Sequence, residues 1–267
     1  MEGTMIALTS YGTSEFNQIQ TLLVKSAIDQ GAHRVSMWHP EHLKETKFYE
    51  RHRDILDRPR GGGYWLWKPY IILMELERLG KGDYLIYHDC GRKNKPDIIR
   101  QPLHHATQWV HDNLGGMLPG SYTPRYGRNA KWTKGECFAV MGCEAPLYKE
   151  HPQIQASVSV WERHDASMDF VREWLHWCTN PAALLDDRID PTIPDDPDFV
   201  DHRHDQSVLT LLAIKRGLKC MGSPLECHYG ERKINGLIER IKGEALVESF
   251  ARKLPVFVRD FPELAAA

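Results

Sequence analysis

The sequence predicts an α/β fold in which a mainly parallel sheet is flanked by helices. Short apolar segments rich in β-branched and aromatic residues stop abruptly at polar or small residues. They alternate with segments in which apolar residues recur every three or four positions, and glycines follow several of these. This alternation favours parallel strands joined by helices. Such sheets bind ligands beyond the carboxyl ends of their strands.

The first three elements follow from the N-terminal pattern. Residues 5–10 form an apolar run that ends in Ser-Tyr-Gly, as a buried strand would. Residues 14–30 have the apolar spacing of a helix, and Gly31 stands where that helix should stop. Residues 34–38 are typical of a second strand.

A second strand and helix pair is predicted further along the chain. After three consecutive glycines, residues 65–79 have helical spacing, with Pro69 acceptable in the first turn. Residues 83–87 then form an apolar strand that stops at His88 and Asp89. Asp89 therefore lies at a sheet edge where ligands bind.

The second half of the chain is less regular. Residues 116–126 are rich in glycine and proline and are expected to be irregular, while residues 138–141 have the composition of a strand. Residues 166–178 and 206–215 have helical spacing. Between them, residues 181–200 are too rich in aspartate and proline for a core segment, so we expect a long loop over one face.

Composition limits the class of protein. The chain has 267 residues, of which 34 are Lys or Arg and 36 are Asp or Glu, and its net charge of −2 argues against a nucleic-acid partner. Neither a leader sequence nor an apolar stretch of about 18 residues is evident, so we expect a cytoplasmic protein, or one peripheral to a membrane. The six cysteines include no Cys-x-x-Cys pair and are expected to be reduced. We expect one domain over residues 1–267, with residues 218–267 as a helical extension packed on it.

Two segments around the predicted sheet edge can carry chemistry. Asp89 can hold a divalent cation that neutralises two phosphates, although an aspartate before a glycine also suits an ordinary turn. Upstream of it, Lys68 at a helix start can reach a phosphate, and Trp65 or Trp67 can stack on a ring. The alternative is a flexible turn followed by core tryptophans.

Two further segments lie in the second half. The run from His202 to Ser207 places acidic, basic and anion-binding groups within one turn, as a reaction centre requires, although Asp205 or Ser207 can also simply cap the next helix. In residues 227–233, His228 can reach a metal and Lys233 a diphosphate. Alone, that last segment is equally typical of a polar loop.

Together these segments resemble nucleotide-sugar glycosyltransferases of the GT-A fold. They are most similar to a group of bacterial and viral sugar transferases that share Gly-Tyr-Trp-x-Trp-Lys-Pro, a strand ending in Asp-x-Gly, and His-Arg-x-Asp-Gln-Ser. The matching residues are 63–69, 87–91, 132–142 and 202–207, spread discontinuously over residues 5–217. The resemblance implies a GT-A-like, Rossmann-related fold. It implies transfer of a sugar from a nucleotide-diphosphate sugar to a glycan, a lipid-linked molecule or another hydroxyl acceptor, in polysaccharide or glycan synthesis.

The resemblance also implies roles for individual residues. Asp89, with His228, would hold Mn²⁺ or Mg²⁺ on the diphosphate, although this chain has Asp-x-Gly where related enzymes have Asp-x-Asp. Asp205 and Gln206 would face the donor sugar as the catalytic pair. Asp205 would act as the base in an inverting enzyme, or would orient the sugar in a retaining one.

The remaining implied roles concern the donor and the acceptor. The residues expected on the donor side are Thr9, Ser10 and Tyr11 against the base and ribose, and Lys68, Arg203 and Lys233 on the phosphates. The residues expected on the acceptor side are Trp132, Lys134 and Glu136. The acidic loop, residues 186–201, would close over the site as a lid.

Two other functions are compatible with the same residues. The first is a metal-dependent hydrolase, in which His202, His204, Asp205 and Asp89 converge on one ion. The second is a catalytically silent module that binds a nucleotide sugar or carbohydrate, since the fold alone does not establish activity.

Overall fold

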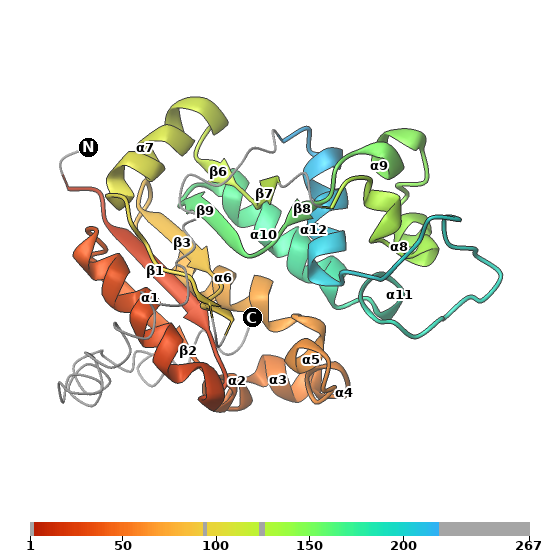
Figure 1. The fold of residues 1–267 in the computed structure, drawn as a ribbon, viewed down its shortest axis with the longest axis horizontal. Coiled ribbons are helices and arrows are strands. Elements are labelled where there is room, and N and C mark those ends of the chain that lie inside the picture. Colours follow the sequence, from red (N-terminus) through yellow and green to blue (C-terminus); the bar gives the residue numbers. More distant parts are fainter. Residues whose placement is uncertain (1–2, 93–94, 123–125, 219–267) are drawn as a thin grey trace.

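The computed structural model describes residues 3–92, 95–122 and 126–218 (Figure 1). Its centre is a five-stranded sheet in the order β2-β1-β3-β9-β6. The strands are β1 (Ile6–Tyr11), β2 (Arg34–Trp38), β3 (Tyr84–His88), β6 (Met117–Leu118) and β9 (Val158–Glu162). Strands β1, β2 and β3 pair in parallel, and β9 pairs antiparallel with both β3 and β6. Four strands therefore share one direction, and the predicted mainly parallel sheet is confirmed.

Helices cover both faces of this sheet because its strands are apolar on both sides. On one face, α1 (Asn17–Asp29) and α7 (Leu103–Leu114) pack on alternate residues of the strands, such as Leu8 and Ile86. On the other face lie α6 (Trp67–Glu77), α10 (Asp165–Cys178) and α12 (Asp205–Lys215), which pack on residues such as Leu85 and Trp161. Figure 1 shows the two layers of helices on either side of the strands.

Shorter elements connect the layers and form the rims of the site. Before α6 these are η1 (Ser14–Phe16), α2 (Pro40–Lys44), α3 (Lys47–Arg51), α4 (Arg53–Leu56) and α5 (Gly61–Tyr64). After β3 they are β4 (Gly91–Arg92), β5 (Lys95–Pro96), β7 (Ser121–Tyr122), η2 (Asn129–Lys131), α8 (Gly135–Val140), α9 (Pro146–Glu150), β8 (Ile154–Gln155) and α11 (Pro181–Leu184). Two small sheets pair β4 with β5 and β7 with β8.

The elements predicted in the first half are all confirmed, and the errors lie in the second half. Residues 138–141 were predicted as a strand, but residues 138–140 end α8 and Met141 is its C-cap, since a four-residue apolar run suits a buried helix equally well. Residues 116–126, predicted to be irregular, contain β6 and β7. Residues 181–200 begin with the short helix α11 and then continue without helix or strand to residue 204.

Several predictions concern residues 219–267, which lie outside the described residues. They include the helical extension, His228, Lys233 and two of the six cysteines. The four described cysteines, Cys90, Cys137, Cys143 and Cys178, are buried and free, as predicted. No described helix has the length and apolar character needed to cross a bilayer.

Candidate functional site

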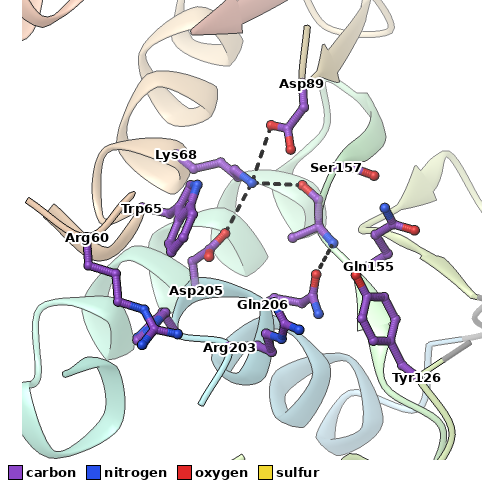
Figure 2. Close-up of a pocket in the computed structure, with 12 residues that line it drawn as sticks. Arg60, Trp65, Lys68, Asp89, Tyr126, Gln155, Ser157, Arg203, Asp205 and Gln206 are labelled. Atoms are coloured by element: carbon purple, nitrogen blue, oxygen red, sulfur yellow. Dashed lines mark hydrogen bonds and ion pairs between the residues drawn. The ribbon is translucent and has the colours of Figure 1, made fainter. Parts of the chain in front are cut away.

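A cavity of about 360 Å³ lies beyond the carboxyl end of β3. It is bounded by the first turns of α6 and α12 and by the turn between β8 and β9 (Figure 2). The residues that line it are Arg60, Trp65, Lys68, Asp89, Tyr126, Gln155, Ala156, Ser157, Arg203, His204, Asp205 and Gln206. The cavity thus brings together the three segments singled out around Lys68, Asp89 and Asp205.

Lys68 is the centre of this site. Its ammonium nitrogen donates a hydrogen bond to the Ala156 carbonyl at 3.1 Å and lies 3.5 Å from Asp89 Oδ1 and 3.4 Å from Asp205 Oδ2. Burial by itself lowers the pKa of Lys68, but the two carboxylates outweigh it and the pKa is raised. An ammonium has three hydrogens, and three acceptors surround this one. Lys68 therefore neutralises two carboxylates and, in this arrangement, has no hydrogen left for the phosphate that it was predicted to bind.

Asp205 is a buried carboxylate with one oxygen paired with the Lys68 ammonium. It is the first residue of α12, and its Oδ2 has only the ion pair with Lys68. Burial raises the pKa of Asp205 to about 6, against the opposing effect of Lys68. The Trp174 indole donates a hydrogen bond to the Asp205 backbone carbonyl at 3.0 Å and so fixes the start of the helix. A carboxylate with this pKa that lines a cavity is suited to accept a proton.

Gln206 supports the Lys68 contact through the backbone. Its Oε1 accepts a hydrogen bond from the Ala156 N–H at 3.2 Å, and its Nε2 donates to Gln153 Oε1 at 2.9 Å. Both ends of the amide are thus engaged with protein groups. Gln206 lines the cavity as predicted, but its contacts hold the turn whose Ala156 carbonyl accepts from Lys68.

Asp89 lies at the end of β3 and supplies one half-exposed carboxylate. Its Oδ1 accepts a hydrogen bond from the Tyr87 hydroxyl and faces Lys68, while its Oδ2 has no hydrogen-bond partner in the described part of the chain. Position 91 is a glycine, and the described residues contain no group of three or more His, Cys, Asp or Glu placed to hold a metal. One carboxylate oxygen beside an ammonium does not fit a divalent cation without further ligands. The described residues of the cavity therefore do not by themselves form a site for the predicted Mn²⁺ or Mg²⁺.

His202 and His204 have structural roles. His202 Nε2 donates to the Ala183 carbonyl at 2.9 Å, while its Nδ1 accepts from the Lys134 N–H at 3.3 Å. Burial holds the pKa of His202 well below its ordinary value, so the ring is neutral. His204 Nδ1 donates to the Leu184 carbonyl at 2.8 Å, and burial lowers its pKa too. Since both nitrogens of His202 are occupied, the metal cage expected of a hydrolase is not formed.

The backbone of His204 positions Asp205. His204 has φ +51° and ψ −118°, a conformation that residues other than glycine rarely adopt. Its ring stacks on Trp65 with a centroid separation of 5.6 Å, and this packing helps to hold the strained residue in place. The sharp bend at His204 starts α12, so the next side chain, Asp205, points into the cavity.

Two arginines line the cavity at the end away from Asp89 (Figure 2). Arg60, which the sequence analysis did not identify, forms ion pairs with Asp201 at 2.8 Å and Asp186 at 3.1 Å. The Arg203 guanidinium lies 4.7 Å from the centre of the Trp132 ring and 5.7 Å from that of Tyr126. These aromatic contacts orient the guanidinium plane.

The other donor residues predicted from the resemblance do not line the cavity. Thr9 and Ser10 are fully buried in β1, where Thr9 Oγ1 donates to the Ser36 carbonyl at 3.4 Å. Tyr11 stacks on Trp67 with a centroid separation of 3.9 Å. Their position at the end of β1 is as predicted, but their side chains pack within the fold.

Two of the residues predicted on the acceptor side, Lys134 and Glu136, hold the acidic loop, residues 186–201. Lys134 and Glu136 form a buried ion pair at 3.1 Å. Lys134 donates to the Asp187 carbonyl at 3.0 Å, and Glu136 accepts from the Asp190 N–H. Trp132 packs behind Arg203. All three therefore lie outside the cavity lining, and the loop predicted as a lid is instead tied to the body of the fold.

Some of the cavity was not predictable from local sequence. Arg60 directly precedes the three glycines, and this neighbourhood is the signal that could have identified it. Gln155, Ala156 and Ser157 form an ordinary turn sequence without any functional signal.

No protein-family model matches the chain, and no curated protein matches it either. Among solved structures, the chain is similar to the galactosyltransferase LgtC in complex with donor and acceptor sugar analogues, with 14% identity, a TM-score of 0.37, and coverage of 77% of this chain and 70% of that one. An active-site mutant of LgtC gives 13% identity and a TM-score of 0.37 over 77% of this chain and 69% of that one. The apo structure of WbbM, a bifunctional glycosyltransferase, gives 9% identity and a TM-score of 0.42, covering 79% of this chain and 37% of that one. These values do not establish a shared activity, so function has to follow from the cavity itself.

Proposed function

We propose that this chain transfers a sugar from a nucleotide-diphosphate sugar to a hydroxyl acceptor, with Asp205 as the general base. The observation that carries this proposal is the Asp205 carboxylate, which is buried beside Lys68 and whose pKa is about 6. Buried carboxylates with a raised pKa that line a cavity cluster at catalytic sites, where they accept or donate protons. The aromatic side chains of Trp65 and Tyr126 line the same space and offer flat faces for a sugar ring.

The proposed reaction uses the cavity as follows. The acceptor oxygen forms a bond to the anomeric carbon of the donor sugar, while the bond from that carbon to the diphosphate oxygen breaks. The proton of the acceptor hydroxyl passes to the Asp205 carboxylate, and the leaving diphosphate takes the electron pair of the broken bond. Lys68 keeps Asp205 largely ionised near neutral pH, since it opposes the effect of burial on the Asp205 pKa.

The remaining parts of the proposal concern partners and place of action. We propose a glycan, a lipid-linked molecule or another hydroxyl compound as acceptor, in polysaccharide or glycan synthesis, and the cytoplasm as the site of action. The divalent cation remains a prediction.

A thermal-shift screen tests the donor class first. UDP-, GDP-, CMP- and dTDP-linked sugars are added to the wild type and to Asp89→Ala, each with Mn²⁺, Mg²⁺ or EDTA. A ligand that binds only the folded state must raise the apparent stability. We expect a shift with one nucleotide, and its dependence on metal and on Asp89 tests the cation prediction.

Product formation then tests the transfer itself. The donor that gives a shift is incubated with a panel of sugar acceptors, and release of nucleoside diphosphate and a glycosylated product are measured. Binding of a donor without either product would contradict the proposal and would indicate a silent binding module. Stabilisation by none of the nucleotide sugars would contradict it as well.

A further inference from the structure

The cavity contains two arginines that differ from Lys68 in what they can contact. The side chains of Arg60 and Arg203 are 40% and 39% exposed, whereas that of Lys68 is 4% exposed and surrounded by protein acceptors. In Figure 2 the arginines lie at one end of the cavity and Asp89 at the other, with Lys68 and Asp205 between them. Among the described cavity residues, these two guanidinium groups are therefore the cations best placed to meet a bound anion.

The chain supplies a carboxylate of its own to both arginines. Arg60 Nη2 donates to both oxygens of Asp201, at 2.9 and 2.8 Å. Arg203 Nε lies 3.9 Å from Asp201 Oδ2 and makes no hydrogen bond to the described residues. Asp201 lies beside both arginines, but it is within hydrogen-bond distance of Arg60 only.

We propose that Arg60 and Arg203 form the subsite for the diphosphate of the donor, and that Asp201 is an internal anion which this diphosphate displaces. The inference rests on the proposed function, since glycosyl transfer requires a group that neutralises the leaving diphosphate. Guanidinium groups match phosphate oxygens in geometry, and Arg203 is already oriented by Trp132 and Tyr126. A diphosphate can bond both arginines at once, whereas Asp201 reaches only one of them at hydrogen-bond distance.

The energetic balance favours this exchange. The Arg60–Asp201 pair is partly exposed, with side-chain exposures of 40% and 34%, and such pairs contribute little. Removing Asp201 therefore costs the folded state little. It frees Nη2 of Arg60, whose Nη1 keeps its pair with Asp186, and it removes the carboxylate that lies beside Arg203. Together with Asp186, Asp201 balances the charge of the two neighbouring arginines until the substrate binds.

Calorimetric titration with inorganic pyrophosphate at low ionic strength tests the subsite. Relative to the wild type, Asp201→Asn should bind pyrophosphate about two- to fivefold more tightly, since an exposed competing ion pair is lost. Arg203→Gln should bind it about tenfold more weakly or worse, since a charge-assisted contact is lost. Asp187→Asn is the matched control, because Asp187 belongs to the same acidic loop but pairs with Arg58 outside the cavity. Its affinity for pyrophosphate should equal that of the wild type.

Two outcomes would overturn the proposal. One is an Asp201→Asn variant, folded as judged by its melting temperature, that binds pyrophosphate no more tightly than the wild type. The other is that the wild type binds glucuronate more tightly than pyrophosphate and that Arg203→Gln loses this glucuronate binding. That result would assign the arginines to an acidic acceptor instead of the donor.

The titration separates this proposal from the proposed function. Pyrophosphate binding needs neither donor sugar nor turnover. If Arg203→Gln transfers sugar with an unchanged KM for the donor, the subsite is wrong and the transferase proposal stands. If the wild type binds pyrophosphate as predicted but transfers no sugar from any donor, the transferase proposal fails by itself.

Discussion

The Asp205 carboxylate lies 3.4 Å from the Lys68 ammonium, and each side chain is only 4% exposed. Lys68 stands in the first turn of α6 and Asp205 begins α12, so two helix starts from distant parts of the chain meet at this ion pair. The same ammonium lies 3.5 Å from Asp89. One buried cation thus holds two carboxylates, of which Asp205 has the raised pKa.

Replacing Asp205 by asparagine tests its role as the base. We expect kcat to fall about 10²- to 10⁴-fold, because general-base assistance to the acceptor hydroxyl is lost. The KM for the donor should change little, and steady-state kinetics with the identified donor measures both. Asp187→Asn, on the surface of the acidic loop, should keep the activity of the wild type. An Asp205→Asn variant that retains full kcat would exclude the assignment.

The pH dependence of the reaction should report the Asp205 pKa. The ionised form accepts the proton, so kcat/KM should rise about tenfold per pH unit below pH 6 and level off above it. Lys68 lowers the Asp205 pKa, so in Lys68→Gln that pKa rises further and the acid limb moves to higher pH. Rate profiles of the two proteins provide the comparison. An acid limb at the same pH in both would show that Asp205 is not the titrating group.

Gln206 should act by positioning the turn that carries Ala156. In Gln206→Ala the bond to the Ala156 N–H is lost, so the carbonyl that accepts from Lys68 is no longer held. We expect kcat to fall about tenfold, in line with the loss of one or two buried hydrogen bonds, with a smaller change in KM. Gln206→Glu keeps an acceptor for the Ala156 N–H and should recover part of kcat. No difference between the two variants would argue against this positioning role.

Arg60 should restrain the acidic loop at both of its ends. It pairs with Asp186 near the start of the loop and with Asp201 at its end. In Arg60→Ala we expect faster cleavage of residues 186–201 by limited proteolysis, followed by mass spectrometry of the fragments. Arg58→Ala removes only the pair with Asp187 and should have the smaller effect. Equal cleavage rates in the two variants would contradict the prediction.

Two neighbouring glycines before α6 should differ in their tolerance of alanine. Gly63 has φ +93°, and a Cβ there would lie 2.5 Å from the Leu56 Cα, so Gly63→Ala should lower the free energy of unfolding by about 3 kcal/mol or more. Gly62 has φ +58° and a nearest neighbour at 3.7 Å, so Gly62→Ala should cost only about 1 kcal/mol. Urea denaturation of both variants measures the difference, and a smaller loss in Gly63→Ala would refute the steric explanation.

The strands and helices of the first half could be predicted because each has a clear local pattern. The apolar run of β1, the helical spacing of α1 and the abrupt end of β3 at Asp89 all depend on neighbours in the sequence. In the second half, the prediction of strands and helices was wrong where the apolar patterns were short. The end of α8 is a four-residue apolar run that suits either structure, and β9 lies between two loops without a distinctive boundary.

The residues of the candidate site could also be predicted only in part. The sequence marked Lys68, Asp89, Arg203, Asp205 and Gln206 as chemically notable, and all five line the cavity. The sequence could not show which of these side chains are already paired with other protein groups and which can contact a ligand. Lys134 and Glu136 have the residue types of an acceptor site, yet their burial beneath the acidic loop gives them a structural role. Whether a side chain is paired depends on groups that are remote from it in the sequence.

By itself, the sequence determined the fold class, the order of the strands and helices around β1 to β3, and the presence of acidic and basic groups at the sheet edge. These are consequences of apolar periodicity and of residue type, which are local properties. Only the tertiary structure decided which partner each group has. It placed Lys68 between Asp89 and Asp205, turned Asp201 towards Arg60, and filled both nitrogens of His202. Ion pairs and hydrogen bonds depend on distances between distant segments, and the packing of helices on the sheet sets those distances.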